Sequence, residues 1–296
     1  MTIGPRPAMV AGVFAMTWAA VLIRWAEAPP LAVAFYRMAF ATFMLGVVAA
    51  ILRVPFWRAW RGVDWWTGAG AATLLALHFG FWITSLEYTT VAASVALVST
   101  QPVFVALIGW AVLRERPGGS AWAGIGLAVA GSVLIAGSDL VFDRRALVGD
   151  VLAVLGAVWI SIYYVAARWL RATKDLLPYI TVIYGFTALV LLAAAATAGA
   201  PLTGYDPATW IALLLLALGP TVLGHSALNY ALRYLRAYEV NVAILGEPVG
   251  AALLALFLLG EAPGPATLLG GGLILAGIFL AQRRRPVRDA VTAANL

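Results

Sequence analysis

Ten apolar stretches, each long enough to cross a bilayer as a helix, follow one another along this chain. They lie at roughly 7–25, 31–52, 66–86, 90–113, 120–138, 148–169, 177–199, 208–231, 238–259 and 265–282. A membrane-spanning helix needs about 20 such residues, and these stretches lack the strict alternation of barrel strands. The sequence therefore predicts an all-α integral membrane protein with ten transmembrane helices.

The composition excludes most other classes of protein. Only 11% of the 296 residues are charged and 63% are hydrophobic, whereas soluble domains carry about 25% charged residues. The chain has no cysteine, so disulfide frameworks and thiolate metal sites are excluded. Ala26-Glu27-Ala28 imitates a signal-peptidase site, but only Arg6 precedes the first apolar stretch, which favours a retained span over a signal peptide.

The Lys and Arg residues are divided unevenly between the two sides of the predicted spans. One side receives Arg6, Arg53, Arg58, Arg61, Arg114, Arg116, Arg168, Arg171, Lys174, Arg233, Arg236, Arg283, Arg284, Arg285 and Arg288. The other side receives only Arg24, Arg144 and Arg145, and Arg37 lies within the second span. Because cytoplasmic loops are rich in Lys and Arg, both termini are expected to be cytoplasmic, in a cell inner membrane. This placement explains the net charge of +6 without a nucleic-acid partner.

The second half of the chain repeats the first. A shift of 146 residues places Gln101-Pro102-Val103 on Glu247-Pro248-Val249, and Glu115, Pro117 and Gly118 on Glu261, Pro263 and Gly264. The sequence therefore divides into residues 1–140 and 141–296, each with five predicted spans. An odd number of spans places the second half in the opposite orientation, and inverted repeats of this kind are common in secondary transporters.

These features resemble the drug/metabolite transporter superfamily, in its ten-helix EamA-like branch. The matching pieces are Pro29-Pro30 before Phe35-Tyr36-Arg37, the mid-span Gln101-Pro102 and Glu247-Pro248, and a Glu-x-Pro-Gly before a glycine-studded span. Within the superfamily the chain is most similar to amino-acid exporters of the YddG type. The resemblance implies export of amino acids, including aromatic ones and other small amphipathic metabolites, by alternating access and without a cofactor.

Polar and aromatic residues deep inside spans are the candidates for a substrate cavity, because burying polar groups in hydrocarbon is costly. His78 and Trp82 stand four residues apart in the third span, and His225 and Asn229 repeat this spacing in the eighth. The full set of cavity candidates is Trp18, His78, Trp82, Ser99, Gln101, Trp159, Tyr163, His225, Asn229 and Glu247. The alternative for each histidine is a structural hydrogen bond. Aromatic residues are often placed at the lipid interface, but Trp159 and Tyr163 lie too deep in their span for that.

Proline and glycine residues within the spans predict local departures from straight, separate helices. Pro102, Pro220 and Pro248 each lack an N–H, so each is expected to bend its helix, as a hinge or beside a water-filled cavity. Gly124 and Gly131 in the fifth span, and Gly270 and Gly277 in the tenth, each stand seven residues apart. Such small residues allow close helix packing, either inside the bundle or in a homodimer.

Glu247 is a carboxylate near the middle of its span, and its partner by repeat symmetry is Gln101. In a low-dielectric interior a carboxylate is either protonated or paired with a cation, and Arg37 is the other strong charge deep within a span. Glu247 is therefore expected to be structural, or to meet a substrate ammonium or exchange a proton during transport.

Three alternatives to amino-acid export remain open from the sequence. A carrier of nucleotide sugars or sugar phosphates is disfavoured because only Arg37 lies within a span to meet phosphate. An intramembrane enzyme is disfavoured because two histidines on separate helices make no metal site and no phosphate-binding glycine loop is present. A structural or sensory membrane protein is disfavoured by the inverted duplication.

Overall fold

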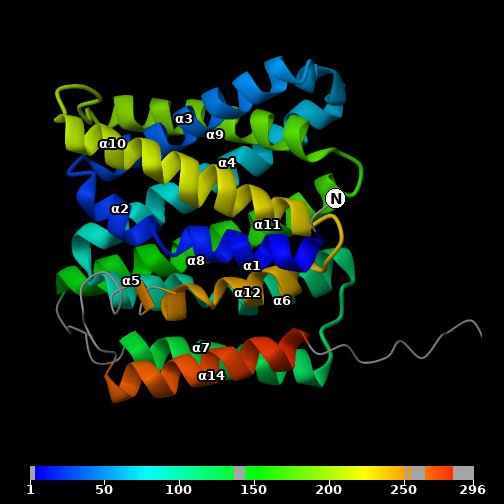
Figure 1. The fold of residues 1–296 in the computed structure, drawn as a ribbon, viewed down its shortest axis with the longest axis vertical. Helices are drawn as coiled ribbons and strands as arrows, with labels where there is room; N and C mark the ends of the chain where they lie inside the picture. Colours follow the sequence, from blue (N-terminus) through cyan, green and yellow to red (C-terminus); the bar gives the residue numbers. More distant parts are fainter. Residues whose placement is uncertain (1–3, 137–143, 251–252, 255–263, 283–296) are drawn as a thin grey trace, which may run out of the picture.

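The computed structural model describes residues 4–136, 144–250, 253–254 and 264–282, and within these ranges every regular element is a helix (Figure 1). The first half contains α1 (Pro5–Met16), α2 (Ala19–Trp25), α3 (Pro30–Ile51), η1 (Phe56–Ala59), α4 (Val63–Tyr88), α5 (Val91–Val98), α6 (Gln101–Leu113) and α7 (Gly119–Ala136). The second half contains α8 (Arg144–Arg171), α9 (Leu176–Thr197), α10 (Pro207–Leu216), η3 (Ala217–His225), α11 (Ser226–Ala231), α12 (Ala237–Ile244) and α14 (Pro265–Gln282).

Most of the predicted spans are found as long apolar helices. Among the described residues, seven helical segments are long and apolar enough to cross a membrane. Two shorter apolar helices, Gly119–Leu134 and Pro265–Ala281, fall on the fifth and tenth predicted spans. The ninth predicted span, 238–259, is described through α12 and residues 245–250, and most of its remainder lies outside the described residues. The protein is thus a multi-pass membrane protein, and the count of ten spans stays a prediction.

The helix starts follow from their sequences. Proline occupies the first turn of α1, α3, α6 and α10, where the missing N–H removes no intrahelical hydrogen bond. The side chain of Asp206 caps α10 by accepting a hydrogen bond from the backbone N–H of Thr209. Hydrogen bonds from Thr209 hold the pKa of Asp206 below its ordinary value, so this cap stays charged at neutral pH.

The two halves pack against each other in a reciprocal pattern. The second predicted span, α3, lies along the seventh, α9, and the fifth, α7, lies along the tenth, α14. The third, α4, packs on the sixth, α8, while the first, α1, packs on the eighth, through η3 and α11. Exchanging the two halves leaves this set of pairs unchanged, which is what a pseudo-two-fold relation between them requires.

The glycine faces pack α7 against α14 within one chain. A Cβ atom on Gly124 would lie 2.5 Å from the carbonyl oxygen of Gly277, and one on Gly131 would lie 2.5 Å from that of Gly270. Residue numbers rise along one helix as they fall along the other, so these equivalent helices are antiparallel, as an inverted repeat demands. Because these glycines pack within one chain, they give no support to the alternative of a homodimer.

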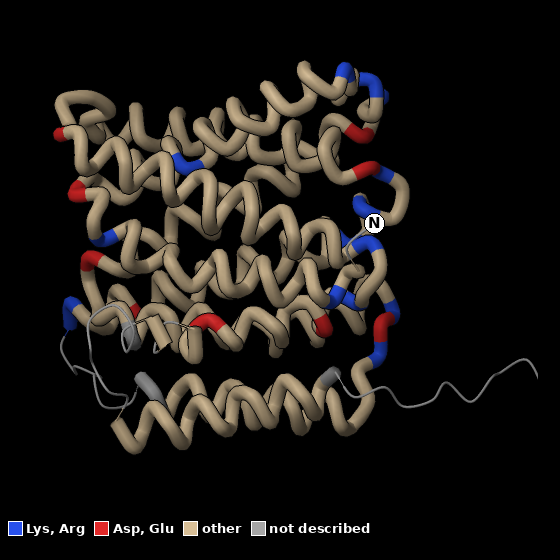
Figure 2. Tube along the Cα trace, viewed as in Figure 1, with Lys and Arg blue, Asp and Glu red and all other residues tan. Residues whose placement is uncertain are grey.

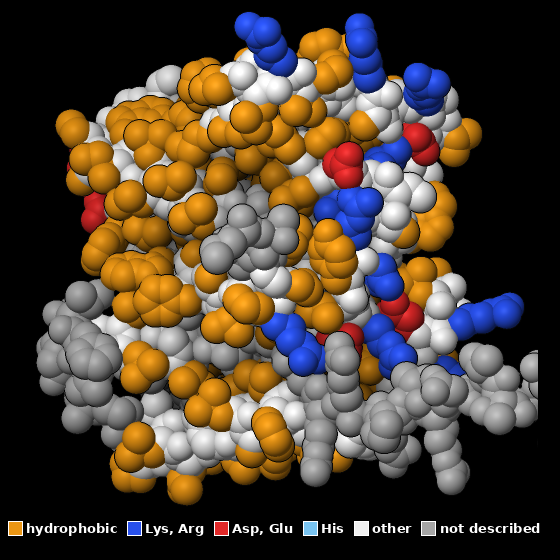
Figure 3. Space-filling view, turned by 45° about the vertical axis from the view of Figure 1, so that its right-hand side comes forward, with side chains coloured by type: hydrophobic (Ala, Val, Ile, Leu, Met, Phe, Trp, Pro, Cys, Tyr) orange, Lys and Arg blue, Asp and Glu red, His pale blue; other side chains and the backbone are white. Residues whose placement is uncertain are grey.

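Charge gathers at the ends of the bundle and apolar side chains cover its sides. Figure 2 shows most of the Lys and Arg residues along the edge of the bundle that carries the N-terminus. Large apolar side chains such as Phe43, Trp66 and Phe279 are more than 70% exposed, and they belong to the broad hydrophobic surface that Figure 3 shows. Such a surface suits lipid and not water. Which end of the bundle is cytoplasmic stays a prediction from the charge distribution.

Candidate functional site

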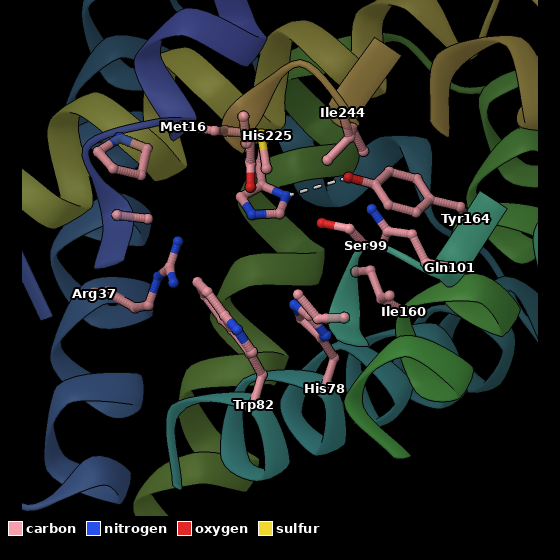
Figure 4. A pocket seen from close by; sticks show the side chains of 14 residues that line it. Met16, Arg37, His78, Trp82, Ser99, Gln101, Ile160, Tyr164, His225 and Ile244 are labelled. Atoms are coloured by element: carbon pink, nitrogen blue, oxygen red, sulfur yellow. Dashed lines mark hydrogen bonds between the residues drawn. The ribbon is translucent and has the colours of Figure 1, made fainter. Parts of the chain in front are cut away.

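A small polar cavity lies inside the bundle, where spans from both halves meet (Figure 4). The centre of a water molecule can occupy about 30 Å³ of this cavity, which is enough space for about two waters. Its walls are formed by Met16, Ala19, Arg37, His78, Trp82, Val98, Ser99, Gln101, Ile160, Tyr164, Pro220, His225, Ile244 and Glu247. Seven of the thirteen predicted site residues therefore line one cavity, although in sequence they are spread from 78 to 247.

Two broken helices bring Gln101 and Glu247 to the cavity. α5 ends at Val98 and α6 begins at Gln101, while α12 ends at Ile244 and a second helical segment begins at Glu247. These breaks are 146 residues apart, the offset of the sequence repeat. Pro102 and Pro248 each stand second in the new segment, so these spans are interrupted at the prolines and not bent within one continuous helix.

Side-chain hydroxyls add hydrogen bonds to backbone carbonyls on both sides of the break between α5 and α6. Ser99 donates to the carbonyl of Val95 (2.6 Å), and Thr100 donates to the carbonyl of Leu97 (2.6 Å). Ser161 of α8 donates to the carbonyl of Gln101 (3.1 Å). Irregular backbone at membrane depth is tolerated where it is buried in protein or lines a cavity, and this break does both.

Pro220 produces a third irregularity, the π-helix η3. Proline has no N–H to give the carbonyl of Leu216, four residues earlier, and the hydroxyl of Thr221 donates to that carbonyl instead (3.1 Å). The same Thr221 oxygen accepts hydrogen bonds from Nε and Nη2 of Arg37, at 3.2 and 3.1 Å. The proline thus creates the local geometry that fixes the cationic side chain of the site.

Arg37 is completely buried and keeps one end of its guanidinium free. Its Cζ lies 4.1 Å from the centroid of the Phe79 ring, a cation–π contact that stabilises charge away from water. The Nη1 atom is buried without a hydrogen-bond partner. The sequence placed Arg37 deep in a span, but did not select it for the cavity.

Glu247 faces the same cavity as Arg37 without pairing with it. Its Oε1 atom is buried and has no hydrogen-bond partner. The ion pairs found among the described residues join Arg168 to Glu115, Lys174 to Asp64 and Arg233 to Asp175, all away from the cavity. The site therefore presents one guanidinium and one carboxyl group, each with an unused polar atom.

His78 and Trp82 form one wall of the cavity, as their spacing predicts. Their rings are stacked, with centroids 5.8 Å apart and an interplanar angle of 9°. The carbonyl of Gly156 lies 2.9 Å from Nδ1 of His78, and since a carbonyl only accepts, the Nδ1–H donates. Neutral His78 therefore keeps Nε2 as an acceptor.

The sixth span contributes residues one position away from the predicted pair. Ile160 and Tyr164 line the cavity, and the hydroxyl of Tyr164 lies 3.5 Å from Nδ1 of His225. Tyr163 is fully buried and donates a hydrogen bond to Oδ1 of Asn229 (3.1 Å). The cavity is not lined by Tyr163 or Asn229, which bond to each other, nor by Trp159.

Trp18 lines a different feature, an apolar groove on the outside of the bundle. The groove lies between α1 and α2 on one side and α10 and η3 on the other, and Phe14, Trp25 and Leu223 also line it. Pro220 is the residue that it shares with the central cavity. As for metals, no three His, Asp or Glu side chains gather at a possible metal site within the described ranges.

Comparison with known proteins gives one family. The profile of the EamA-like transporter family matches residues 7–137 and again residues 147–282. The chain is 28% identical to an uncharacterized transporter of Archaeoglobus fulgidus over 88% of this chain and 90% of that protein. It is 29% identical to a probable terminal-alkyne amino-acid exporter of Streptantibioticus cattleyicolor, over 64% of this chain and 63% of that one.

A solved crystal structure shares the fold. It superposes with a TM-score of 0.80 at 19% sequence identity, covering 94% of this chain and 96% of its own. At this identity the likeness concerns the fold alone.

Proposed function

Because the chain belongs to the EamA-like transporter family, we propose that it transports α-amino acids, holding the zwitterion between Arg37 and Glu247. The observation that carries the proposal is the pair of unused polar atoms in one cavity, Nη1 of Arg37 and Oε1 of Glu247. A guanidinium binds a carboxylate through directed hydrogen bonds, and a carboxylate binds an ammonium group.

The electrostatics of the cavity favour a zwitterion over singly charged substrates. A buried charge without a partner is costly, and a substrate with both charges gives each side chain its missing partner. An amine would leave Arg37 unpaired, and a carboxylic acid would leave Glu247 unpaired unless it took up a proton. The name of the Streptantibioticus relative, a probable amino-acid exporter, supports the same substrate class.

Transport requires the cavity to open, since its present volume is too small for an amino acid. We infer alternating access, in which residues 1–140 and 141–296 rock against each other as inverted repeats. At the basic end, Glu115 of the first half binds Arg168 and the backbone N–H of Ala237, and Asp64 binds Lys174. These contacts join the two halves at that end, and we infer that they must break when it opens.

The proposed location and direction rest on the charge distribution and the family resemblance. Placing the basic end in the cytoplasm of a cell with an inner membrane gives cytoplasmic termini, and export is the direction proposed. The alternatives are weaker. A sugar phosphate would bring at least two negative charges to one guanidinium and one carboxylate, and the match to a transporter family gives an enzyme no support.

Counterflow in proteoliposomes tests the proposal. Vesicles containing the purified protein are loaded with unlabelled tryptophan, and uptake of labelled tryptophan is competed with tryptamine, indole-3-propionate and glucose 6-phosphate. Tryptamine and indole-3-propionate each lack one charged group and should compete at least about tenfold more weakly than tryptophan, since a charge-assisted hydrogen bond contributes about 1.5–3 kcal/mol.

The controls separate a failed assay from a failed proposal. Arg37→Met and Glu247→Gln should reduce uptake, whereas Trp66→Phe, at an exposed apolar position, should not. Equal competition by tryptophan and its two analogues would refute the zwitterion site. Exchange of glucose 6-phosphate without exchange of any amino acid would favour the sugar-phosphate carrier.

A further inference from the structure

One polar atom of the cavity wall is left over once a zwitterion is bound. Among the described residues, the buried side-chain atoms without a hydrogen-bond partner are Arg37 Nη1, Trp82 Nε1, Trp159 Nε1, Asn241 Oδ1 and Glu247 Oε1. Of these residues, only Arg37, Trp82 and Glu247 line the cavity. The carboxylate and ammonium groups of an amino acid satisfy two of the three atoms. The indole N–H of Trp82 still needs an acceptor.

The structure fixes the indole of Trp82 in its position. Its ring stacks on His78, and in Figure 4 it stands between Arg37 and His78 in the space beneath His225. The backbone of α8 packs against the base of this side chain, because a Cβ on Gly156 would lie 3.2 Å from the Cβ of Trp82. The side chain is only 7% exposed, so it cannot easily turn its N–H toward solvent.

We propose that Trp82 selects substrates by donating a hydrogen bond from Nε1 to a neutral acceptor in the side chain of the bound amino acid. The inference rests on the proposed function and names the preferred substrates as amino acids with a hydroxyl, ether, carboxamide or similar oxygen, while amino acids without one are transported but bound less tightly. A site with a buried donor discriminates against an analogue that lacks the acceptor, because the donor is then left unpaired. A charged side chain is excluded because Arg37 and Glu247 are already matched by the zwitterion.

The indole N–H is a donor only, which makes a sharp comparison possible. O-methylserine and norvaline have side chains of the same length and differ by an ether oxygen in place of one methylene. Threonine and valine form a second pair of equal shape. In both pairs the proposal requires the oxygen-containing member to bind more tightly, and a donor on the substrate is not required.

The experiment measures competition by these four amino acids against counterflow of labelled alanine in proteoliposomes containing the full chain. For the wild-type protein, O-methylserine and threonine should compete about tenfold more tightly than norvaline and valine, the effect of one hydrogen bond to an otherwise unpaired donor. Trp82→Phe keeps an aromatic ring beside His78 and removes the N–H. It should bring both ratios close to one while leaving norvaline and valine within about threefold of wild type.

Trp159→Phe is the matched control. Trp159 also has a buried indole N–H without a partner, but it does not line the cavity, so this variant should keep both wild-type ratios. The proposal is overturned if wild-type protein does not distinguish the members of either pair. It is also overturned if Trp82→Phe weakens all four competitors equally, or if Trp159→Phe alters the ratios as strongly.

Failure of this inference is distinguishable from failure of the proposed function. Alanine counterflow without discrimination between the paired competitors removes the role of Trp82 and leaves an amino-acid transporter. Absence of any amino-acid flux, with the protein correctly inserted, removes both. If Trp82→Phe does not fold, the wild-type ratios for the two pairs decide the matter on their own.

Discussion

If Arg37 binds the substrate carboxylate as proposed, Thr221 controls that binding without touching the substrate. Its hydroxyl accepts from Nε and Nη2 of Arg37 and donates to the carbonyl of Leu216, which Pro220 leaves without its usual donor. Valine has the shape of threonine but no hydroxyl. Thr221→Val therefore removes all three hydrogen bonds without opening a cavity.

The cost of this substitution follows from the contacts. The two bonds from Arg37 share one acceptor and count as one charge-assisted interaction, of about 1.5–3 kcal/mol. Hydrogen bonds measured in a membrane protein average about 0.6 kcal/mol, which applies to the bond with Leu216. The expected loss of stability is about 2–4 kcal/mol, reduced by whatever Arg37 regains in turning toward Glu247.

Two measurements test this reasoning. Thermal unfolding in detergent should show a lower melting temperature for Thr221→Val, and tryptophan affinity should fall by at least about tenfold because Arg37 is no longer held for the substrate carboxylate. Thr221→Ser restores the hydroxyl and should recover most of the affinity. Thr187→Val removes a buried hydroxyl that bonds only to backbone carbonyls and should leave the affinity unchanged. Wild-type stability and affinity in Thr221→Val would refute the argument.

Three further changes test the fold and the site. Gly131→Val should separate α7 from α14 and lower the melting temperature by the equivalent of about 1–3 kcal/mol, whereas Gly126→Val, with no atom within 4 Å of its Cβ, should not. Single cysteines at Arg144 and Thr173, both exposed, should react with impermeant reagent from opposite sides of the membrane. Labelling of both from one side would refute the predicted crossing of the membrane by α8. Glu247→Gln imitates the neutral acid, so the protein should still fold and insert into the membrane. It should lose affinity for amino acids and any dependence of transport on protonation of Glu247. Unchanged transport would leave Glu247 with a structural role.

Much of the fold could be predicted because each membrane helix needs a long run of apolar residues, and such runs are visible in the sequence. The apolar stretches mark the helices, and the glycines spaced seven apart mark the close contact between α7 and α14. The sequence could not say whether that contact lies within one chain, since two copies of the chain offer the same face. Nor did it show the breaks at Val98–Gln101 and Ile244–Glu247, because the proline in each signalled a bend as readily as an interruption.

Whether a predicted site residue lines the cavity depends on the rotation of its helix. His78, Trp82, Gln101, His225 and Glu247 line the cavity, but α8 presents Ile160 and Tyr164 there in place of Trp159 and Tyr163. Both pairs are four residues apart, and neighbouring residues differ by about 100° around the axis. Spacing alone does not select between them.

The sequence nevertheless contains a signal for the face of α8 that lines the cavity. Gly156 lets the backbone of α8 approach Trp82, and Ile160 stands one turn further on the same face, with Tyr164 one turn beyond it. Small residues mark the side of a membrane helix that meets its neighbours. Gly156 therefore identifies the face of α8 that packs toward α4, whereas Trp159 and Tyr163 lie to one side of that face.

The charges of the cavity depend on a difference between the repeats and not on their similarity. Both halves place a residue at the start of a helical segment beside the cavity, Gln101 in one and Glu247 in the other. With glutamate at both positions the cavity would hold two anions and one cation, a poor match for a zwitterion. Glutamine at one of them leaves Glu247 to balance Arg37. We infer that the two repeats supply equivalent positions, and that the difference between Gln101 and Glu247 gives the cavity the single carboxyl group on which amino-acid binding would depend.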